Sequence, residues 1–292
     1  MSSRLTIFTP TYNRAYTLSR LYESLKQQTC KNFIWLIVDD GSTDNTYELI
    51  RSWMDEKLIN IKYYRQRNSG KHVAHNVGVN LCDSELFFCV DSDDWLPDYA
   101  VEFIIKFWEN NYSPEIAGIV GLKAFESGEV VGSYMPKGIT KSTLFDLYNK
   151  YRKKGDTALI FRTDVLKKFP FPVIDGEKFI TENIVYDMID QEYQLLVVNK
   201  VLYYCEYLND GLTRNAFRLQ KNNPRGYILY YRNRMKIAPT LSLKFKYITM
   251  YSVYNMLAGE KGWIKSSPYK FLTLISIPFA IAIKFYRYRN VK

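Results

Sequence analysis

Cysteine and histidine are scarce in this chain of 292 residues. Its four cysteines form no CxxC pair, and the histidines are His72 and His75. A zinc site needs several Cys or His ligands close together, so this composition excludes one. So few cysteines also exclude a disulfide-stabilised scaffold and favour a reducing compartment. Hydrophobic residues make up 47% and charged residues 24%, so we expect a chain that folds by burying apolar side chains.

Several functional signatures are also missing. The sequence contains neither GxGxxG nor a P-loop, which argues against dinucleotide and P-loop functions. Residues 1–8 carry one positive charge and a short apolar run, so nothing indicates export. The uncharged stretch 271–283 is 13 residues long and contains Pro278. It is shorter than the roughly 20 residues that span a bilayer, and we expect the proline to interrupt it.

The net charge of +10 is unevenly distributed along the chain. Residues 211–292 hold 16 Lys or Arg and a single acid, Glu260, whereas residues 1–210 have a net charge of −5. A basic, tyrosine-rich tail attracts nucleic acid, anionic membranes and phosphorylated substrates alike. Charge alone leaves these three partners open.

The first half alternates short apolar runs with amphipathic stretches. The runs predict strands at 5–9, 33–38, 61–64 and 86–90, and the stretches predict helices at 18–25, 47–54, 73–81 and 98–108. This alternation predicts an α/β fold with a largely parallel sheet. Further on, the pattern predicts strands at 116–120, 130–134, 158–161 and 195–198, a helix at 182–190, and from 217 onward helices broken at Pro224, Pro239 and Pro268.

Aspartates gather directly after two of the predicted strands. Asp39, Asp40 and Asp44 follow the second strand, and the run Asp91 to Asp94 follows the fourth. Turn and capping roles are the alternative, above all for Asp44. Three acids at one strand end favour a cation, and Mg²⁺ or Mn²⁺ shared with a diphosphate suits this oxygen-rich pattern.

Four strings in order carry a family resemblance: TPTYNR (9–14), VDDGSTD (38–44), NSGKHVAHNVG (68–78) and VDSDDW (90–95). The sequence resembles family 2 glycosyltransferases of the GT-A fold, strongly over the first 110 residues and more weakly to 213. The resemblance implies a GT-A domain at 1–215, with a nucleotide-binding part at 1–110 and an acceptor part at 111–215. A basic helical extension at 216–292 follows.

The resemblance also implies residue roles. Tyr12 would pack on the nucleobase, and Asp40 would accept a hydrogen bond from the base edge, which suits uracil N3–H. Asp91 and Asp93 would form the metal-binding DxD pair, with Asp94 close by. The implied donor-site residues are Pro10, Tyr12, Asn13, Asp40, Gly70, Lys71, Asn76, Asp91, Asp93 and Arg214. Lys71 would supply charge to the diphosphate, and the histidines are assigned no chemistry.

An inverting transferase of this family needs a catalytic base. The matching stretch GEKFITENIVYD (176–187) has Asn183 where an aspartate often stands, so we assign the base to Glu182 and keep Glu177 and Asp187 in reserve. A helix-start acid is the alternative role for Glu182.

Together these features predict a metal-dependent inverting glycosyltransferase. It would move a sugar from a nucleotide diphosphate, UDP by preference, to a hydroxyl of a lipid-linked or polymeric bacterial surface glycan. We expect a cytoplasmic protein that contacts the membrane's inner face through residues 268–292; a packed helix or a dimer contact are the alternatives for that tail. The rival functions are a sugar nucleotidyltransferase, which would open with a glycine-rich loop, and a nucleic-acid-binding protein, for which no motif is present.

Overall fold

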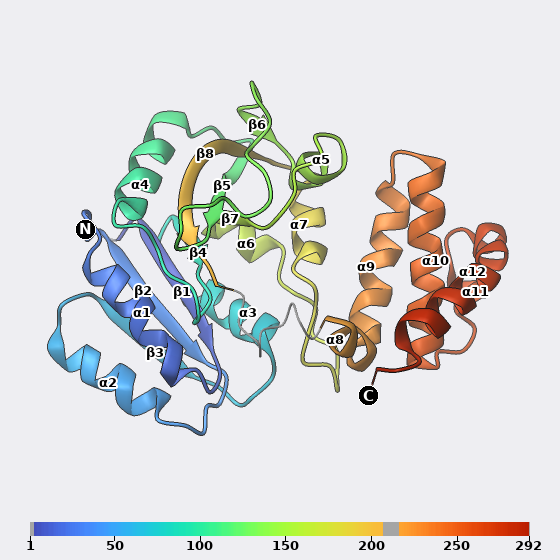
Figure 1. Ribbon diagram of the computed structural model, residues 1–292, viewed down its shortest axis with the longest axis horizontal. Helices are drawn as coiled ribbons and strands as arrows, with labels where there is room; N and C mark the ends of the chain where they lie inside the picture. Colours follow the sequence, from blue (N-terminus) through green and yellow to red (C-terminus); the bar gives the residue numbers. More distant parts are fainter. Residues whose placement is uncertain (1–2, 207–215, 292) are drawn as a thin grey trace. The chain divides into compact units, whose positions relative to one another are not determined.

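The computed structural model describes residues 3–206 and 216–291, which form two compact units (Figure 1). The N-terminal unit contains the described residues up to Pro170 together with Val185–Glu206. The C-terminal unit contains Phe171–Ile184 and the described residues from 216 onward.

The N-terminal unit is built on an eight-stranded sheet. In chain order its strands are β1 (Leu5–Thr11), β2 (Phe33–Asp39), β3 (Ile61–Arg65), β4 (Leu86–Cys89), β5 (Ile116–Ala124), β6 (Lys141–Ser142), β7 (Thr157–Arg162) and β8 (Gln194–Tyr204). In space they run β3-β2-β1-β4-β7-β5-β8-β6. The first four are mutually parallel, as predicted, whereas β7 is antiparallel to β4 and β5, and β6 is antiparallel to β8. The sheet is therefore mixed.

Helices flank this sheet (Figure 1). In the N-terminal unit they are α1 (Ala15–Lys26), α2 (Thr46–Glu56), α3 (Lys71–Leu81), α4 (Ala100–Asn111), α5 (Leu144–Asn149), α6 (Thr163–Lys168) and α7 (Asn183–Ile189), which begins in the C-terminal unit. The first four confirm the predicted helices to within a few residues. They form because their apolar side chains recur every three or four residues, as Leu18, Leu21 and Leu25 do on the buried face of α1.

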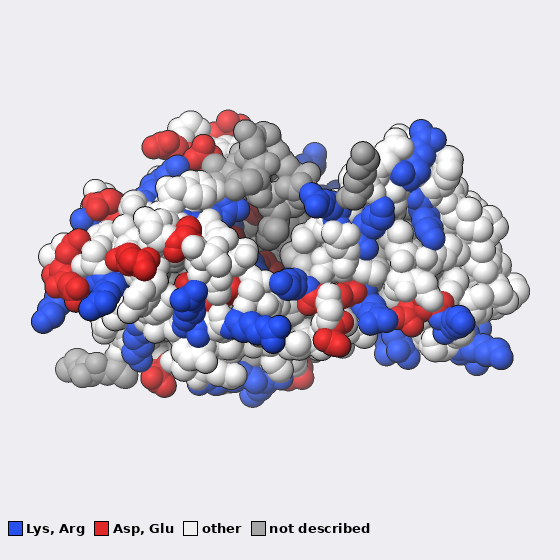
Figure 2. Space-filling view, turned by 90° about the horizontal axis from the view of Figure 1, so that it is seen from below, with Lys and Arg blue, Asp and Glu red and all other residues white. Residues whose placement is uncertain are grey.

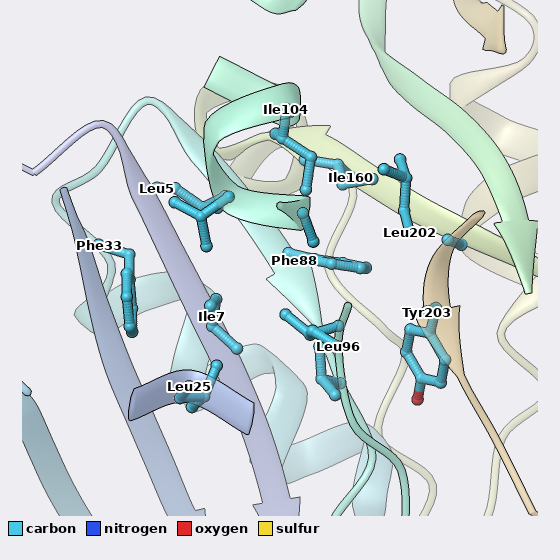
Figure 3. Packing of buried hydrophobic residues seen from close by; sticks show 14 of the residues in the cluster. Leu5, Ile7, Leu25, Phe33, Phe88, Leu96, Ile104, Ile160, Leu202 and Tyr203 are labelled. Atoms are coloured by element: carbon cyan, nitrogen blue, oxygen red, sulfur yellow. The ribbon is translucent and has the colours of Figure 1, made fainter. Parts of the chain in front are cut away.

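The main core lies between the sheet and the helices α1, α2 and α4 (Figure 3). Leu5 and Ile7 of β1 and Phe88 of β4 are fully buried in it. A second part is aromatic: the Tyr22 ring of α1 stacks on Trp53 of α2 with the ring centroids 4.4 Å apart. This burial fixes β1, β2 and β4 side by side, and their carboxyl ends carry the motif residues.

The strand predicted at 130–134 is wrong. This segment makes only an isolated bridge, between Ala124 and Val130. Gly132 has φ +79°, and a Cβ there would lie 2.2 Å from the Lys154 carbonyl oxygen. The positive φ of Gly132 lies outside the extended region, so the backbone turns at this glycine and no strand continues through the segment.

The C-terminal unit is helical from residue 216 onward. Its helices are α8 (Ala216–Asn222), α9 (Pro224–Ile237), α10 (Leu241–Ala258), α11 (Trp263–Ser266) and α12 (Lys270–Tyr288). Pro224, Pro239 and Pro268 lie at helix boundaries, as predicted, but Pro278 does not interrupt α12. Pro278 lies on the exposed side of the helix. A proline has no N–H, so one carbonyl in the preceding turn loses its helical partner, and on this side water can hydrogen-bond to it. Within the described residues, α12 is the one helix long and apolar enough to cross a membrane by length and composition.

Candidate functional site

The motif residues meet at one edge of the sheet. Because β1 pairs in parallel with both β2 and β4, the carboxyl ends of these strands lie together. Ligands of open α/β sheets bind at this edge. TPTYNR, VDDGSTD and VDSDDW all occupy it.

The carboxylates after β4 form a charged cluster. Lys71, the first residue of α3, places its Nζ 2.7 Å from Asp91 Oδ1. Burial opposes ionisation of Asp91, but the charges of Lys71 and Lys123 outweigh it and lower the pKa of that carboxyl. Burial and then the charge of Asp91 raise the pKa of Asp93, and the same two causes raise the pKa of Asp94 to about 7. Lys71 and Lys123 therefore offset part of the negative charge of these carboxylates.

Two residues far along the chain hold this cluster in place. The hydroxyl of Tyr203 on β8 donates to Asp94 Oδ2 over 2.7 Å and accepts from the Asp91 backbone N–H over 2.9 Å. Lys123 on β5 places its Nζ 3.7 Å from the centre of the Tyr203 ring. The motif strings gave no sign of either residue, because the pairing of β5 with β8 brings them to the site.

Asp40 anchors the loop that precedes α3. Its Oδ1 accepts from Gln66 Nε2 over 2.7 Å and from the Ser69 N–H over 2.8 Å. Its Oδ2 accepts from the Gly70 N–H over 2.8 Å and from Asn68 Nδ2 over 3.3 Å. Gly70 has φ +99°, a conformation that favours glycine, and caps α3. These four bonds hold Gly70 and Lys71 at the sheet edge.

The loop after β1 is tied to the VDDGSTD turn. Asn13, at φ +52°, donates its N–H to Ser42 Oγ over 2.9 Å and accepts from the Thr43 N–H over 2.7 Å. Asp44 accepts from the Thr46 hydroxyl over 2.6 Å and from the backbone N–H groups of Ala15 and Thr46. Burial would raise the pKa of this carboxyl, but these bonds, that of the Thr46 hydroxyl first, outweigh it and lower the pKa. Asp44 thus joins the starts of α1 and α2.

The predicted donor residues of this loop differ in exposure. Pro10 is buried within β1, whereas Tyr12 is 46% exposed, which leaves its ring accessible for stacking. Asn76 is partly buried on α3. Arg214 lies outside the described residues.

A divalent ion shared with a diphosphate fits the carboxylate cluster. In the described part of the chain, no group of three or more His, Cys, Asp or Glu side chains is arranged to hold a metal ion. Asp91 and Asp93 are hard oxygen donors, and burial first and then the neighbouring charge of Asp91 raise the pKa of Asp93. Mg²⁺ and Mn²⁺ accept one or two carboxylates and complete their coordination with phosphate oxygens and water.

The three base candidates have different surroundings. Glu177 accepts from the backbone N–H groups of Arg225 and Gly226, over 2.6 and 2.8 Å, and so caps α9 within the C-terminal unit. Asp187 is 3% exposed within α7. Glu182 is partly exposed directly before α7. Among the three, Glu182 is the one whose side chain is partly exposed, since Glu177 and Asp187 are both buried.

Comparisons with known proteins agree with the motif strings. A family model described as Glycosyl transferase family 2 matches residues 6–169. The poly(ribitol-phosphate) beta-N-acetylglucosaminyltransferase TarP of Staphylococcus aureus is 29% identical over 237 residues, which cover 77% of this chain and 68% of TarP. An uncharacterized glycosyltransferase of Rickettsia felis is 35% identical over 109 residues, and this chain covers 18% of its length.

Two solved structures share the fold. S. aureus TarS 1–349 in complex with UDP-GlcNAc matches with a TM-score of 0.62 at 19% identity, covering 99% of this chain and 90% of that one. The mannosyltransferase PcManGT of Pyrobaculum calidifontis, in complex with GDP-Man and Mn²⁺, matches with a TM-score of 0.58 at 14% identity, covering 97% and 87%. The predicted GT-A architecture is thereby confirmed.

Proposed function

Because the chain belongs to glycosyltransferase family 2, we propose that it transfers a sugar from a nucleoside diphosphate to a hydroxyl group, with inversion at the anomeric carbon. The observation that carries this proposal is the carboxylate cluster after β4, with Lys71 2.7 Å from Asp91 at the carboxyl edge of the sheet. Clustered acids beside the Lys71 ammonium suit a site that binds a cation and a diphosphate together.

Different residues of the chain bind different parts of the donor. Tyr12 stacks on the nucleobase, and the loop from Gly70 to Asn76 lies along the diphosphate, where Lys71 shares its ammonium between Asp91 and the phosphate oxygens. Asp91 and Asp93 would hold the divalent ion, Mn²⁺ or Mg²⁺, which would supply positive charge to the leaving diphosphate. The Tyr203 hydroxyl holds Asp91 and Asp94 in position through its two hydrogen bonds. Arg214 is proposed as a further diphosphate contact.

Glu182 acts as the base in this proposal. An inverting transfer needs a carboxylate that takes the acceptor hydroxyl's proton while the anomeric carbon is attacked. Glu177 is committed to capping α9, and Asp187 is buried. The capping role of Glu177 and the burial of Asp187 therefore support Glu182 as the base.

We propose a UDP-sugar as donor and a hydroxyl-bearing bacterial surface glycan as acceptor. TarS binds UDP-GlcNAc, and TarP is described as acting on poly(ribitol phosphate). A polymer of that kind is anionic, and residues 211–292 carry 16 bases against one acid. Attraction between the basic segment and a phosphate-rich acceptor supports this choice.

We also propose a peripheral contact between α12 and the cytoplasmic face of the membrane. The small residues Thr273, Ser276 and Ala280 are buried, and Ser276 Oγ lies 2.9 Å from Ser252 Oγ of α10. The exposed large side chains of α12 are Phe271, Leu274, Ile275, Phe279, Ile281, Phe285 and Tyr286. Lys and Arg side chains are spread over the C-terminal unit beside uncharged areas (Figure 2). Apolar and aromatic side chains flanked by cations suit an anionic bilayer surface.

A donor panel tests the proposed function. The parent chain is heated with UDP-, GDP- and CDP-sugars, each with Mn²⁺ and with EDTA. A ligand at 100 times its dissociation constant adds about 2.7 kcal/mol of stability, so we expect one UDP-sugar to raise the melting temperature in the presence of Mn²⁺. No stabilisation by any nucleotide sugar would contradict the proposal.

A further inference from the structure

Arg20 of α1 contacts two residues that lie far along the chain. Its guanidinium lies 4.3 Å from the centre of the Trp95 ring, and its Nη1 donates to Glu206 Oε2 over 2.9 Å. Trp95 directly follows Asp94, and Glu206 follows the end of β8. The side chains of Arg20 and Glu206 are 42% and 50% exposed, and an ion pair as exposed as this contributes little to stability. The significance of Arg20 lies instead in the two segments that it joins.

The sheet itself does not align these two segments, because β7 and β5 lie between β4 and β8. Residues 94–95 and 203–206 meet instead through polar contacts at the carboxyl edge. The Trp95 N–H donates to the Tyr204 carbonyl over 3.1 Å, and the Tyr204 N–H donates to the Trp95 carbonyl over 2.8 Å. This pair is an isolated antiparallel bridge. Two hydrogen bonds open more easily than a strand ladder, so side-chain contacts that hold the bridge closed matter here.

The same alignment holds the carboxylate cluster. Asp94 Oδ2 accepts from the Tyr203 hydroxyl over 2.7 Å, and Asp94 Oδ1 accepts from the Glu206 N–H over 3.3 Å. The Tyr203 hydroxyl also accepts from the Asp91 N–H over 2.9 Å. A shift of the end of β8 would therefore loosen both Asp94 and the backbone of Asp91.

We propose that Arg20 is a positioning residue for the metal-binding carboxylates. Its planar guanidinium stacks on Trp95 and pairs with Glu206 at the same time, and so joins the end of β8 to the turn after β4. With the two segments joined, Asp91 is held where it can share a divalent ion with a diphosphate. Arg20 acts through Trp95 and Glu206 rather than on the donor. This inference rests on the proposed function, since it presupposes a divalent ion bound together with a nucleotide donor.

Hydrogen exchange of the free protein tests the contact between the two segments without any ligand. Arg20→Met keeps much of the apolar stem of the side chain and removes the guanidinium. An exposed cation–π contact and an exposed ion pair are then lost together, so we expect the N–H groups of Trp95, Tyr204 and Glu206 to exchange about tenfold faster. The N–H groups within β1 should exchange at the parental rate.

Calorimetry of UDP binding with Mn²⁺ and with EDTA tests the consequence for the site. Arg20→Met should lower the Mn²⁺ enhancement of UDP affinity about tenfold, a usual size for coupling between two ligands, and should leave UDP affinity in EDTA unchanged. Arg20→Lys should also lose most of the enhancement, because an ammonium is a point charge without the planar fork that stacks and pairs at once.

Arg4→Met is the matched control. Arg4 Nη1 lies 2.8 Å from Glu85 Oε2, and the two side chains are 49% and 39% exposed, so this ion pair resembles that of Arg20. Arg4 directly precedes β1 and therefore lies at the opposite edge of the sheet from the carboxylate cluster. Arg4→Met should leave both the exchange of the three N–H groups and the Mn²⁺ enhancement of UDP affinity unchanged.

Parental exchange of these N–H groups in Arg20→Met would overturn the inference, and so would a parental Mn²⁺ enhancement of UDP affinity in that variant. An equal loss of UDP affinity with Mn²⁺ and in EDTA would overturn it as well, since Arg20 would then act on the nucleotide and not on the metal ligands. A parent protein that binds no nucleoside diphosphate would instead contradict the proposed function, and the exchange experiment would still decide whether Arg20 joins the two segments.

Discussion

Replacing Tyr203 with phenylalanine tests how much the Tyr203 hydroxyl contributes to holding the carboxylate cluster in place. The ring is 1% exposed, and phenylalanine fills the same space. The change removes only the hydroxyl, which donates to Asp94 over 2.7 Å and accepts from the Asp91 N–H over 2.9 Å. One carboxylate oxygen and one backbone N–H lose their partner.

The expected cost follows from these two bonds. A hydrogen bond to a charged group contributes about 1.5 to 3 kcal/mol, and an unpaired buried amide costs about 1 to 3 kcal/mol. Since Asp94 also accepts from the Glu206 N–H at 3.3 Å, part of its stabilisation remains. We expect Tyr203→Phe to lower the free energy of unfolding by about 2 to 4 kcal/mol. Because Asp91 would be held less firmly, UDP binding should also weaken more in the presence of Mn²⁺ than in EDTA.

Urea denaturation and calorimetry measure these two effects. Tyr204→Phe is the matched control, because Tyr204 is the next residue of β8 and packs its ring against Trp95 with centroids 5.9 Å apart. It should change stability by less than about 0.5 kcal/mol. If Tyr203→Phe matched the parent in both stability and Mn²⁺ dependence, the positioning role of Tyr203 would be refuted.

Three further predictions address the metal ligands, the base and the tail. Asp93→Ala should abolish divalent-dependent transfer and leave metal-free UDP binding largely intact; an undiminished Mn²⁺ enhancement of UDP affinity in calorimetry would disprove the ligand role. Glu182→Gln should slow turnover roughly 10² to 10⁴-fold with little change in donor affinity. Near-normal transfer by this variant would show that Glu182 is not the base, as would a loss of this size in Asp187→Asn but not in Glu182→Gln. Replacing Phe271 and Phe285 together with serine should reduce the fraction of protein that sediments with anionic vesicles. The parent and Leu58→Ser, an exposed control in the N-terminal unit, should sediment fully. No vesicle binding by the parent, or salt-independent dimerisation through this face, would refute the membrane contact.

The sequence predicts the first half of the fold well for a physical reason. β1, β2 and β4 are largely apolar runs because both faces of each are covered, whereas β3 lies at the sheet edge and is partly exposed. The segment 130–134 misleads because its valines and tyrosine have strand propensity, while the decisive contact of Gly132 with Lys154 is tertiary. Pro278 misleads similarly, since its place on the exposed side of α12 follows from packing.

The site is predictable only where its residues are local in sequence. Asp91, Asp93 and Lys71 lie within recognisable strings, and the structure brings Lys71 to Asp91. Tyr203 lies beyond the strand predicted at 195–198, near the end of β8. No local pattern indicates that its hydroxyl reaches Asp91 and Asp94.

Sugar transfer itself tests the central claim most directly. The purified chain is incubated with the UDP-sugar that stabilises it, a polyol-phosphate polymer as acceptor, and either Mn²⁺ or EDTA, and UDP release and the mass of the acceptor are followed. The account predicts UDP release and a matching gain of sugar on the acceptor with Mn²⁺, and neither in EDTA or in Asp93→Ala. Equal transfer by the parent and Asp93→Ala, with or without a divalent ion, would contradict a transferase built on the carboxylates after β4.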